Sequence, residues 1–233
     1  MRLNSRPVNH VQEIMIIKHE TISFAQQQII LTNQRAFFWE SQQILVLSDL
    51  HLGKAAHFRK NGIALPAQLS IDDLSRLEAL ILHFNPGRVL IVGDLIHAGA
   101  NSEVALFGRF TASFPEIDFL LVKGNHDRLT PELLSGLGIR AVYDELVIGA
   151  LHFIHHPEQH RPGQYTISGH LHPGVAVRMP AKRIMHFPCY AVTEEQLILP
   201  AFAKFTGTDT RSVPRPANCY AFYEAGIFQV SHH

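Results

Sequence analysis

The chain has few cysteines, no long apolar run and no net charge, and each of these absences excludes a class of protein. It has two cysteines, Cys189 and Cys219, in 233 residues, which argues against a disulfide framework and against a thiolate zinc site. No apolar run reaches the ~18 residues that a membrane-spanning helix needs, so we expect no contact with a membrane. The formal net charge is +0, so global charge does not attract a polyanion, and any nucleic-acid contact would need a local patch.

The N-terminus has polar residues where a signal peptide would need an apolar stretch, which makes secretion unexpected. Together with the scarcity of cysteine, this predicts a cytoplasmic protein. The length and a hydrophobic content of 46% suit a single domain over residues 1–233 with a sizeable core. Residues 1–20 contain one short apolar run and are expected to form an N-terminal arm.

Histidine is the residue present in unusual number, with 16 in the chain, and histidine is common at metal sites. The polar residues of interest fall in short segments that share carboxylate, imidazole and amide side chains. These segments are Asp49-Leu50-His51, Gly93-Asp94, Gly124-Asn125-His126-Asp127, His155-His156 and Gly169-His170-Leu171-His172. Two divalent cations ~3.5–4 Å apart, held by such ligands, form a recurring device for cleaving phosphate esters.

Aliphatic runs lead into several of these segments. Strands are expected over 44–47, 89–92 and 119–122, and helices over 69–84 and 102–114. Continuous aliphatic strands that alternate with helices predict an α/β sheet covered by helices. Ligands of such sheets gather at the carboxyl ends of the strands, where these segments stand.

The remaining patterns predict further strands. Residues 29–31 and 36–39 are expected to form a hairpin. After Pro131, we expect a second, mainly antiparallel set of strands over 139–143, 146–148, 151–154, 165–168, 183–187, 196–199, 219–223 and 227–230. Residues 206–216 are expected to form a surface loop.

Taken singly, each of the first two segments could be an ordinary turn instead of a set of metal ligands. Asp49 and His51 flank one residue at the end of a strand, where alternation places both side chains on one face. The alternative is a turn that happens to contain aspartate. Asp94 could bridge two cations through its two oxygens, although an aspartate after glycine is more often a simple turn residue.

The later segments are more specific. The amide oxygen of Asn125 is a neutral ligand suited to a divalent cation. His126 could protonate a leaving group or stabilise charge on the phosphoryl oxygens, and Asp127 could orient its imidazole. The spacing of His170 and His172 again favours a pair of metal ligands over two structural histidines.

The pattern Asp-x-His, Gly-Asp, Gly-Asn-His-Asp, His and Gly-His-x-His resembles that of the calcineurin-like metallophosphoesterases. The resemblance implies a four-layer α-β-β-α sandwich with two mixed sheets. It implies one metal held by Asp49, His51 and His172, another held by Asn125, His155 and His170, Asp94 as the bridge and His126 as the general acid. Many members have glycine after the fourth-motif histidine, and this chain has His156. The choice of His155 over His156 therefore follows only its position in the motif.

Further segments are similar to a bacterial phosphodiesterase group, the ligase-associated DNA damage response endonucleases (PdeM). They are Ser48-Asp49-Leu50-His51-Leu52-Gly53-Lys54, Phe58-Arg59, Gly62, Leu199-Pro200-Ala201-Phe202 and Phe205-Thr206-Gly207. This likeness implies a phosphodiester substrate in DNA, and an ATP-dependent DNA ligase and a helicase as functional neighbours.

The expected chemistry is attack on phosphorus by a metal-bound hydroxide, because coordination can lower the pKa of water to ~7. Nitrogen and oxygen ligands favour manganese, and they leave iron and zinc possible. The basic residues that follow the first motif closely could contact a phosphate backbone, with a solvated loop as the alternative. They are Lys54, His57, Arg59 and Lys60, of which Lys54 and Arg59 are the chosen candidates for binding substrate. A second basic cluster, Arg178, Lys182 and Arg183, has a weaker case.

Three functions remain open from the sequence. The first is a DNA-directed phosphodiesterase or endonuclease in repair. The second is a phosphatase or phosphodiesterase of a small molecule or nucleotide, which the neutral net charge slightly favours. The third is a non-catalytic interaction module on the same fold, which ranks last because all the expected positions are filled.

Overall fold

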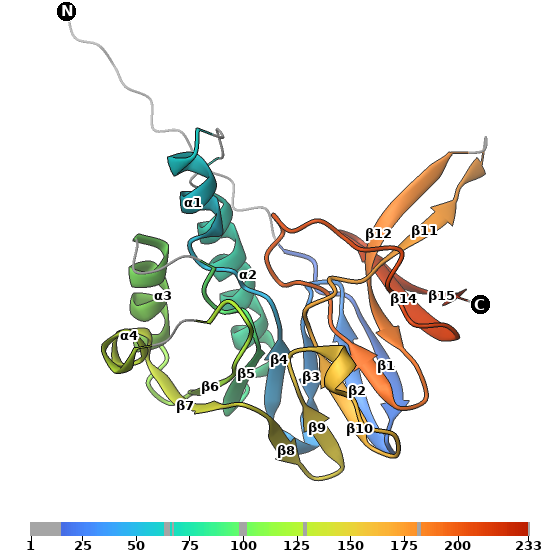
Figure 1. Ribbon diagram of the computed structural model, residues 1–233, viewed down its shortest axis with the longest axis horizontal. Helices are drawn as coiled ribbons and strands as arrows, with labels where there is room; N and C mark the ends of the chain where they lie inside the picture. The colour runs from blue at the N-terminus through green and yellow to red at the C-terminus, as the bar shows by residue number, and fades with distance from the viewer. Residues whose placement is uncertain are drawn as a thin grey trace, which may run out of the picture.

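The computed structural model describes residues 15–62, 66, 68–97, 102–127, 130–180 and 183–232. Two mixed β-sheets pack face to face, and helices cover the outer face of the first sheet (Figure 1). The expected α/β sandwich of two mixed sheets is confirmed. Residues 1–14 of the expected arm and Lys182 of the second basic cluster lie outside the described residues.

The first sheet has the strand order β1-β2-β3-β4-β5-β6-β7. Its strands are β1 (His19–Phe24), β2 (Gln27–Thr32), β3 (Phe37–Trp39), β4 (Ile44–Leu47), β5 (Arg88–Val92), β6 (Asp118–Val122) and β7 (Ile139–Tyr143). Pairing is antiparallel from β1 to β4 and parallel from β4 to β7. Every residue of β4 is buried, because a central strand of a covered sheet meets protein on both faces. The expected hairpin is the β2–β3 pair.

The helices are α1 (Lys54–Lys60), α2 (Gln68–Phe84), α3 (Ser102–Ala112) and α4 (Pro131–Leu137), with 3-10 turns η1 (Glu40–Gln42) and η2 (Pro157–Gln159). The two helices expected from apolar spacing, α2 and α3, pack on the first sheet, where Leu77, Leu80 and Phe107 are fully buried. Helices α1 and α4 were not predicted from the sequence. In α1 only Ala55 is buried, so its sequence carries no apolar stripe. In α4 the signal was present, since Thr130 caps the N-terminus and accepts a hydrogen bond from the backbone N–H of Leu133.

The second sheet has the order β15-β14-β12-β13-β10-β9-β8, and β11 pairs with β12. Its strands are β8 (Leu146–Ile148), β9 (Leu151–Phe153), β10 (Tyr165–Ser168), β11 (Gly174–Arg178), β12 (Ile184–Val192), β13 (Gln196–Ile198), β14 (Ala217–Tyr223) and β15 (Gly226–His232). The assignment of residues 139–143 to this second set was wrong. They form β7, which joins the first sheet parallel to β6 because α4 provides the crossover that a parallel pair needs.

Three hydrophobic layers hold the sandwich together. Trp39, Phe153 and Ile167 are among the residues buried between the two sheets. On the outer face of the second sheet, the buried free cysteines Cys189 and Cys219 pack in one cluster with Val213 from the segment 199–216. That segment, which contains the expected loop 206–216, has no helix or strand among its residues. None of the helices in the described part of the chain is long and apolar enough to cross a membrane.

Candidate metal centre

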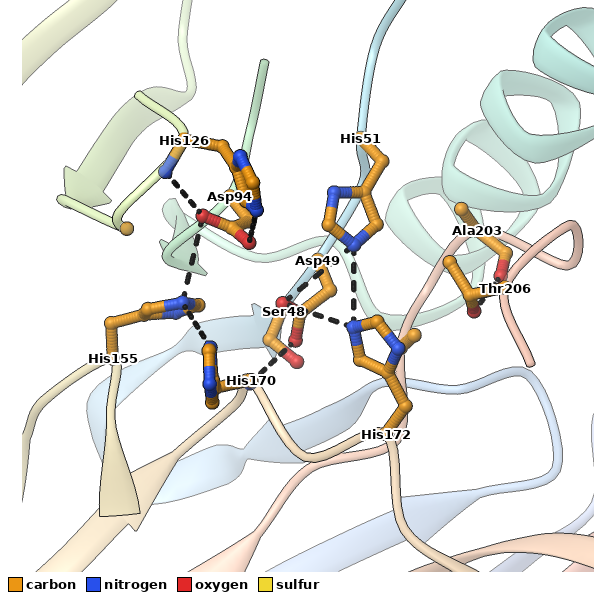
Figure 2. A network of polar contacts seen from close by, with 12 residues as sticks. Ser48, Asp49, His51, Asp94, His126, His155, His170, His172, Ala203 and Thr206 are labelled. Carbon is orange, nitrogen blue, oxygen red and sulfur yellow. Dashed lines mark hydrogen bonds and ion pairs between the residues drawn. The ribbon is translucent and has the colours of Figure 1, made fainter. Parts of the chain in front are cut away.

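The polar segments follow the carboxyl ends of strands from both sheets and meet at one edge of the sandwich. Asp49 and Asp94 follow β4 and β5 of the first sheet, and His155 and His170 follow β9 and β10 of the second. Because β4, β5 and β6 run parallel, their carboxyl ends lie side by side, as expected for a site of this kind. The segments that the sequence singled out are therefore neighbours in space (Figure 2).

One group, which we call the Asp49 group, consists of Asp49, His51 and His172. The Nε2 atoms of His51 and His172 lie 3.2 Å apart, and Nε2 of His172 lies 3.4 Å from Oδ1 of Asp49. One ligand atom from each residue lies within 4.8 Å of the others. Three donors that converge on one point without filling it are suited to hold a cation.

A second group, the Asp94 group, consists of Asp94, His155 and His170. Nε2 of His155 lies 3.5 Å from Oδ1 of Asp94 and 3.2 Å from Nδ1 of His170. Nδ1 of His155 faces the backbone carbonyl of Val92 at 3.3 Å, so that carbonyl can fix the tautomer that leaves Nε2 as an electron-pair donor. Figure 2 shows the imidazoles of both groups turned toward one another.

Five of these six residues have backbones in the left-handed region, where non-glycine residues are uncommon. The φ angles are +53° at Asp49, +50° at His51, +47° at Asp94, +70° at His170 and +49° at His172. Such conformations cost of order 1 kcal/mol each and gather at functional sites. They also correct one expectation. Asp49 and His51 lie beyond the end of β4, so left-handed turns, and not strand alternation, bring the two side chains together.

Glycines leave the room that the two groups need. A Cβ atom at Gly93 would lie 1.8 Å from Nδ1 of His155, and one at Gly124 would lie 2.1 Å from Oδ1 of Asp94. At Gly169 a Cβ would come within 2.5 Å of Oδ2 of Asp49. No side chain fits at these three positions, which explains the glycine that precedes each of these segments.

The electrostatics of the two groups favours cation binding. Burial opposes ionisation of Asp49, but its contact with His172 and the neighbouring imidazoles outweigh that effect and lower its pKa. Burial lowers the pKa of His51 to about 3 against the attraction of Asp49, and burial with the imidazoles of His156 and His155 lowers the pKa of His170. At neutral pH Asp49 is therefore a carboxylate, and His51 and His170 are neutral imidazoles, the protonation states that bind metal.

One buried atom lacks a partner in a way that fits an absent ligand. Oδ1 of Asp49 accepts no hydrogen bond from any described residue, although Oδ2 accepts one from the backbone N–H of His170 at 3.0 Å. An unsatisfied buried carboxylate oxygen is costly, and a divalent cation held by Asp49, His51 and His172 would satisfy it. The residues present therefore fit a metal ion.

The third segment flanks the Asp94 group. The backbone N–H of His126 donates to Oδ1 of Asp94 at 3.1 Å, and Nε2 of its half-exposed ring lies 4.0 Å from Oδ2. Asp127 does not contact that ring within the described structure, since its oxygens accept the backbone N–H groups of Ile96 at 2.9 Å and Gly124 at 2.8 Å. Asn125 is exposed, and its amide forms no hydrogen bond with another described residue.

The structure separates the two adjacent histidines of the fourth segment. His155 is buried and lies in the Asp94 group. The ring of His156 stacks on that of His170 with 4.0 Å between centroids, and its Nδ1 accepts a hydrogen bond from the backbone N–H of Glu158 at 3.4 Å. Position in the fold therefore favours His155 as the ligand, with His156 packed behind His170.

The two candidate substrate-binding residues have different surroundings. Arg59 forms an ion pair with Glu103 at 2.9 Å, so its charge is already compensated and holds α1 to the start of α3. Lys54 is partly buried beside the site, and burial lowers its pKa against the attraction of Asp49 and Asp94. Lys54 therefore remains the stronger candidate for contact with substrate.

The sequence analysis missed the segment that supports the Asp49 group. The backbone N–H groups of Phe202 and Ala203 donate to the carbonyls of Ser48 at 2.8 Å and Asp49 at 3.2 Å. Arg76 of α2, fully buried, donates to the carbonyl of Phe202. The motif Leu199-Pro200-Ala201-Phe202 was visible in the sequence, but nothing there indicated what it touches. Arg76 gave no signal, since charged residues on helices are usually exposed.

Comparison with known proteins agrees with this geometry. The family model for calcineurin-like phosphoesterases matches residues 43–168, more than half of the chain. The chain therefore belongs to the calcineurin-like phosphoesterase family, and it is a metal-dependent phosphoester hydrolase. None of the curated protein sequences compared with the chain matches it.

The fold is similar to that of a solved structure, and two further solved structures match less well. Nuclease MPE from Pseudomonas putida superposes with a TM-score of 0.77 at 24% identity, covering 91% of this chain and 100% of that chain. The phosphoesterase Yfce from E. coli has a TM-score of 0.43 at 15% identity, covering 81% and 98%. Protein AQ665 from Aquifex aeolicus has a TM-score of 0.40 at 19% identity, covering 55% and 78%.

Proposed function

We propose that the protein is a phosphodiesterase that uses two divalent metal ions to cleave a nucleic-acid strand, with DNA as its substrate. The observation that supports this most strongly is the pair of converging groups, in which five of six residues hold a left-handed backbone. The structural likeness to a protein described as a nuclease and the sequence likeness to the ligase-associated endonucleases favour a diester of nucleic acid.

We assign the ligands by group. The Asp49 group would hold one metal ion, and the Asp94 group with Asn125 would hold the other, with Asp94 as the bridge. When bound, the two cations would withdraw charge from the phosphoryl oxygens and lower the pKa of a water nucleophile. The nitrogen and oxygen ligands favour Mn²⁺, with iron or zinc as the alternatives.

The residues around the two groups position and protonate the substrate. His126 is exposed on one side and held to Asp94 on the other, so its imidazole can donate a proton to the departing alkoxide. Asp127 fixes the turn that carries His126, because both its oxygens bind backbone N–H groups. Lys54 would attract the negatively charged substrate to this edge of the sandwich.

The likeness to the PdeM group supports a role in DNA repair, with an ATP-dependent DNA ligase and a helicase as functional partners. The scarcity of cysteine supports a cytoplasmic location. Hydrolysis of a small nucleotide is the second candidate, because the net charge of +0 gives no general attraction to a polyanion.

A substrate panel with defined metals tests the proposal. We expect Mn²⁺-dependent cleavage of single-stranded or double-stranded DNA and of bis(4-nitrophenyl) phosphate, inhibited by a chelator. The panel includes a cyclic nucleotide and 4-nitrophenyl phosphate, and Asp144→Asn, at an exposed residue paired with Lys123, serves as the variant control. Cleavage of monoesters or nucleotides without cleavage of DNA would favour the second candidate, and no hydrolysis with any metal would contradict both.

A further inference from the structure

Three side chains at one flank of the metal centre have no assigned role in holding metal. Lys54 and His57 belong to α1, and His97 follows β5. The ring of His97 lies 5.7 Å from that of His51 and 5.1 Å from that of His126, centroid to centroid. The ring of His57 lies a further step out, 6.0 Å from that of His97. A row of imidazoles thus leads from the metal centre to α1.

Lys54 has no ion pair within 4.0 Å among the described residues. Burial lowers its pKa, and the attraction of the nearby Asp49 and Asp94 opposes that effect. These two carboxylates are the ones assigned to the metal ions. When these carboxylates bind metal ions, they no longer neutralise the partly buried ammonium group of Lys54. That group is then without a counter-ion. An anionic substrate would supply one.

The fold holds α1 in place without using Lys54 or His57. Glu103 of α3 accepts the backbone N–H of Gly53 at 2.8 Å and the guanidinium of Arg59 at 2.9 Å, which fixes both ends of the short helix. His57 is exposed, and the side-chain amide of Asn61 contacts its Nε2 at 3.2 Å. The helix is therefore a fixed support that holds the partly buried Lys54 and the exposed His57 beside the site.

His97 has a buried nitrogen without a partner. No described residue forms a hydrogen bond with its Nδ1, while its backbone N–H donates to the carbonyl of Leu52 at 2.9 Å. A buried polar atom that serves no contact in the fold destabilises the protein, and unsatisfied groups of this kind require an explanation in terms of function or an unseen partner.

We propose that Lys54, His57 and His97 form a second phosphate-binding site, which takes the phosphate next to the scissile one in a nucleic-acid strand. This inference rests on the proposed function and adds a substrate preference to it. His57 lies two rings away from His51, so a lone diester on the metal centre would not extend to it. A strand with a neighbouring phosphate would, and that second charge would hold the strand in register.

Three oligothymidylates test the proposal. Their linkages are neutral methylphosphonates except at one position in the first, at the next position in the second, and at both positions in the third. We expect the third to be cleaved about tenfold faster, in kcat/KM, than the sum of the first two, because only in the third does a diester on the metal centre have a charged neighbour for the second phosphate site. In Lys54→Met and in His57→Ala we expect the three rates to be additive within about twofold.

The matched control is Lys60→Met, which removes a positive charge from an exposed residue of the same helix. We expect it to keep the cooperative enhancement. Binding of the doubly charged oligonucleotide to metal-free protein gives a readout without turnover. The slope of log Kd against log salt should be about 0.7 smaller in Lys54→Met than in Lys60→Met, the loss of one contact to a single strand.

The outcomes separate this proposal from the proposed function. Additive rates in the wild type, or an equal loss of cooperativity in Lys54→Met and Lys60→Met, would overturn the second phosphate site while cleavage of single diesters still supported the phosphodiesterase. Failure to cleave any of the three oligonucleotides would overturn both.

Discussion

The two groups of the metal centre use the same side chains, one aspartate and two histidines each, but the fold holds them differently. The Asp49 group rests on backbone hydrogen bonds from residues 202 and 203 to Ser48 and Asp49. The Asp94 group lies against the turn 124–127, where Asn125 and His126 are exposed. One group is held by a buried segment, and the other is flanked by an exposed turn where a substrate can enter.

The support beneath the Asp49 group depends on a buried charge. Arg76 donates to Oδ1 of Asp73 at 2.7 Å and to the carbonyl of Phe202, and its guanidinium lies over the ring of Phe202, 4.3 Å from the centroid. Asp73 also accepts the backbone N–H of Lys204 at 3.3 Å. Helix α2 thus holds the segment that holds Asp49. Stability and catalysis are thus divided between the two sides of the centre.

The substitution that should lower kcat/KM most removes a ligand of the metal centre. Asp94→Asn removes the carboxylate that contacts both His155 and the turn of His126, so we expect kcat/KM to fall by about a thousandfold or more, equivalent to ~4 kcal/mol. Metal analysis of the purified variant should show fewer than two ions per chain. Asp144→Asn should keep wild-type activity and metal content. Full activity in Asp94→Asn would remove Asp94 from the centre.

The next largest effect is a loss of stability on the side of the Asp49 group. Arg76→Met leaves Asp73 buried without its partner, and we expect the free energy of unfolding of the metal-free protein to fall by about 3–5 kcal/mol. Arg140→Met breaks the exposed pair with Asp118 and should cost less than about 1 kcal/mol. Urea denaturation followed by circular dichroism measures both.

If Arg76→Met does not fold, the double variant Arg76→Met with Asp73→Asn still tests the role of this ion pair. It removes the unpaired charge of Asp73 and should recover part of the unfolding free energy. An equal loss in the Arg76 and Arg140 variants would contradict the role given to Arg76.

On the open side, His126→Ala should lower kcat about a hundredfold, the lower range for loss of a general acid. Because His126 is in neither group of ligands, the metal content should stay at the wild-type value. His83→Ala, an exposed histidine at the end of α2, is the control. A loss of metal in His126→Ala would show that the residue serves the centre and not the leaving group.

The smallest effect is a pH dependence of stability. Burial raises the pKa of Asp127 to about 6 against the hydrogen bonds from Ile96 and Gly124. A raised pKa means that the folded protein binds this proton more tightly than the unfolded chain. Its contribution is therefore complete below the unfolded pKa, ~4, and is lost as the pH rises through about 6.

We expect the unfolding free energy of the metal-free protein to fall over that window by up to ~2 kcal/mol more in the wild type than in Asp127→Asn. Asp144→Asn should follow the wild type. Parallel pH curves for wild type and Asp127→Asn would show that Asp127 does not titrate in this way.

The sequence predicted what local patterns and fixed motifs determine. The aliphatic runs identified β4, β5 and β6, and the apolar spacing identified α2 to within one residue at its start. The division of the ligands into two groups came from the resemblance of the motifs to the calcineurin-like family, and it agrees with the two clusters of the structure apart from Asn125. Where a prediction depended on a local pattern alone, as for residues 139–143, pairing with the first sheet could not be foreseen because it depends on the crossover through α4.

The features that the sequence did not predict come from contacts between distant residues. Arg76 meets Phe202, 126 positions away, and Arg59 meets Glu103, 44 positions away. The left-handed turns at Asp49 and His51 also have no signature, because aspartate and histidine adopt many conformations. The contact of Arg59 with Glu103 leaves Lys54 as the basic residue for substrate, and the contact of Arg76 with Phe202 supports the Asp49 group.

A crystal structure of the protein soaked in Mn²⁺, with anomalous scattering recorded at the manganese edge, tests the central claim most directly. Two peaks are predicted, one among Asp49, His51 and His172 and one among Asp94, His155 and His170. The absence of anomalous signal at both groups, or manganese bound elsewhere with these side chains unchanged, would contradict the account.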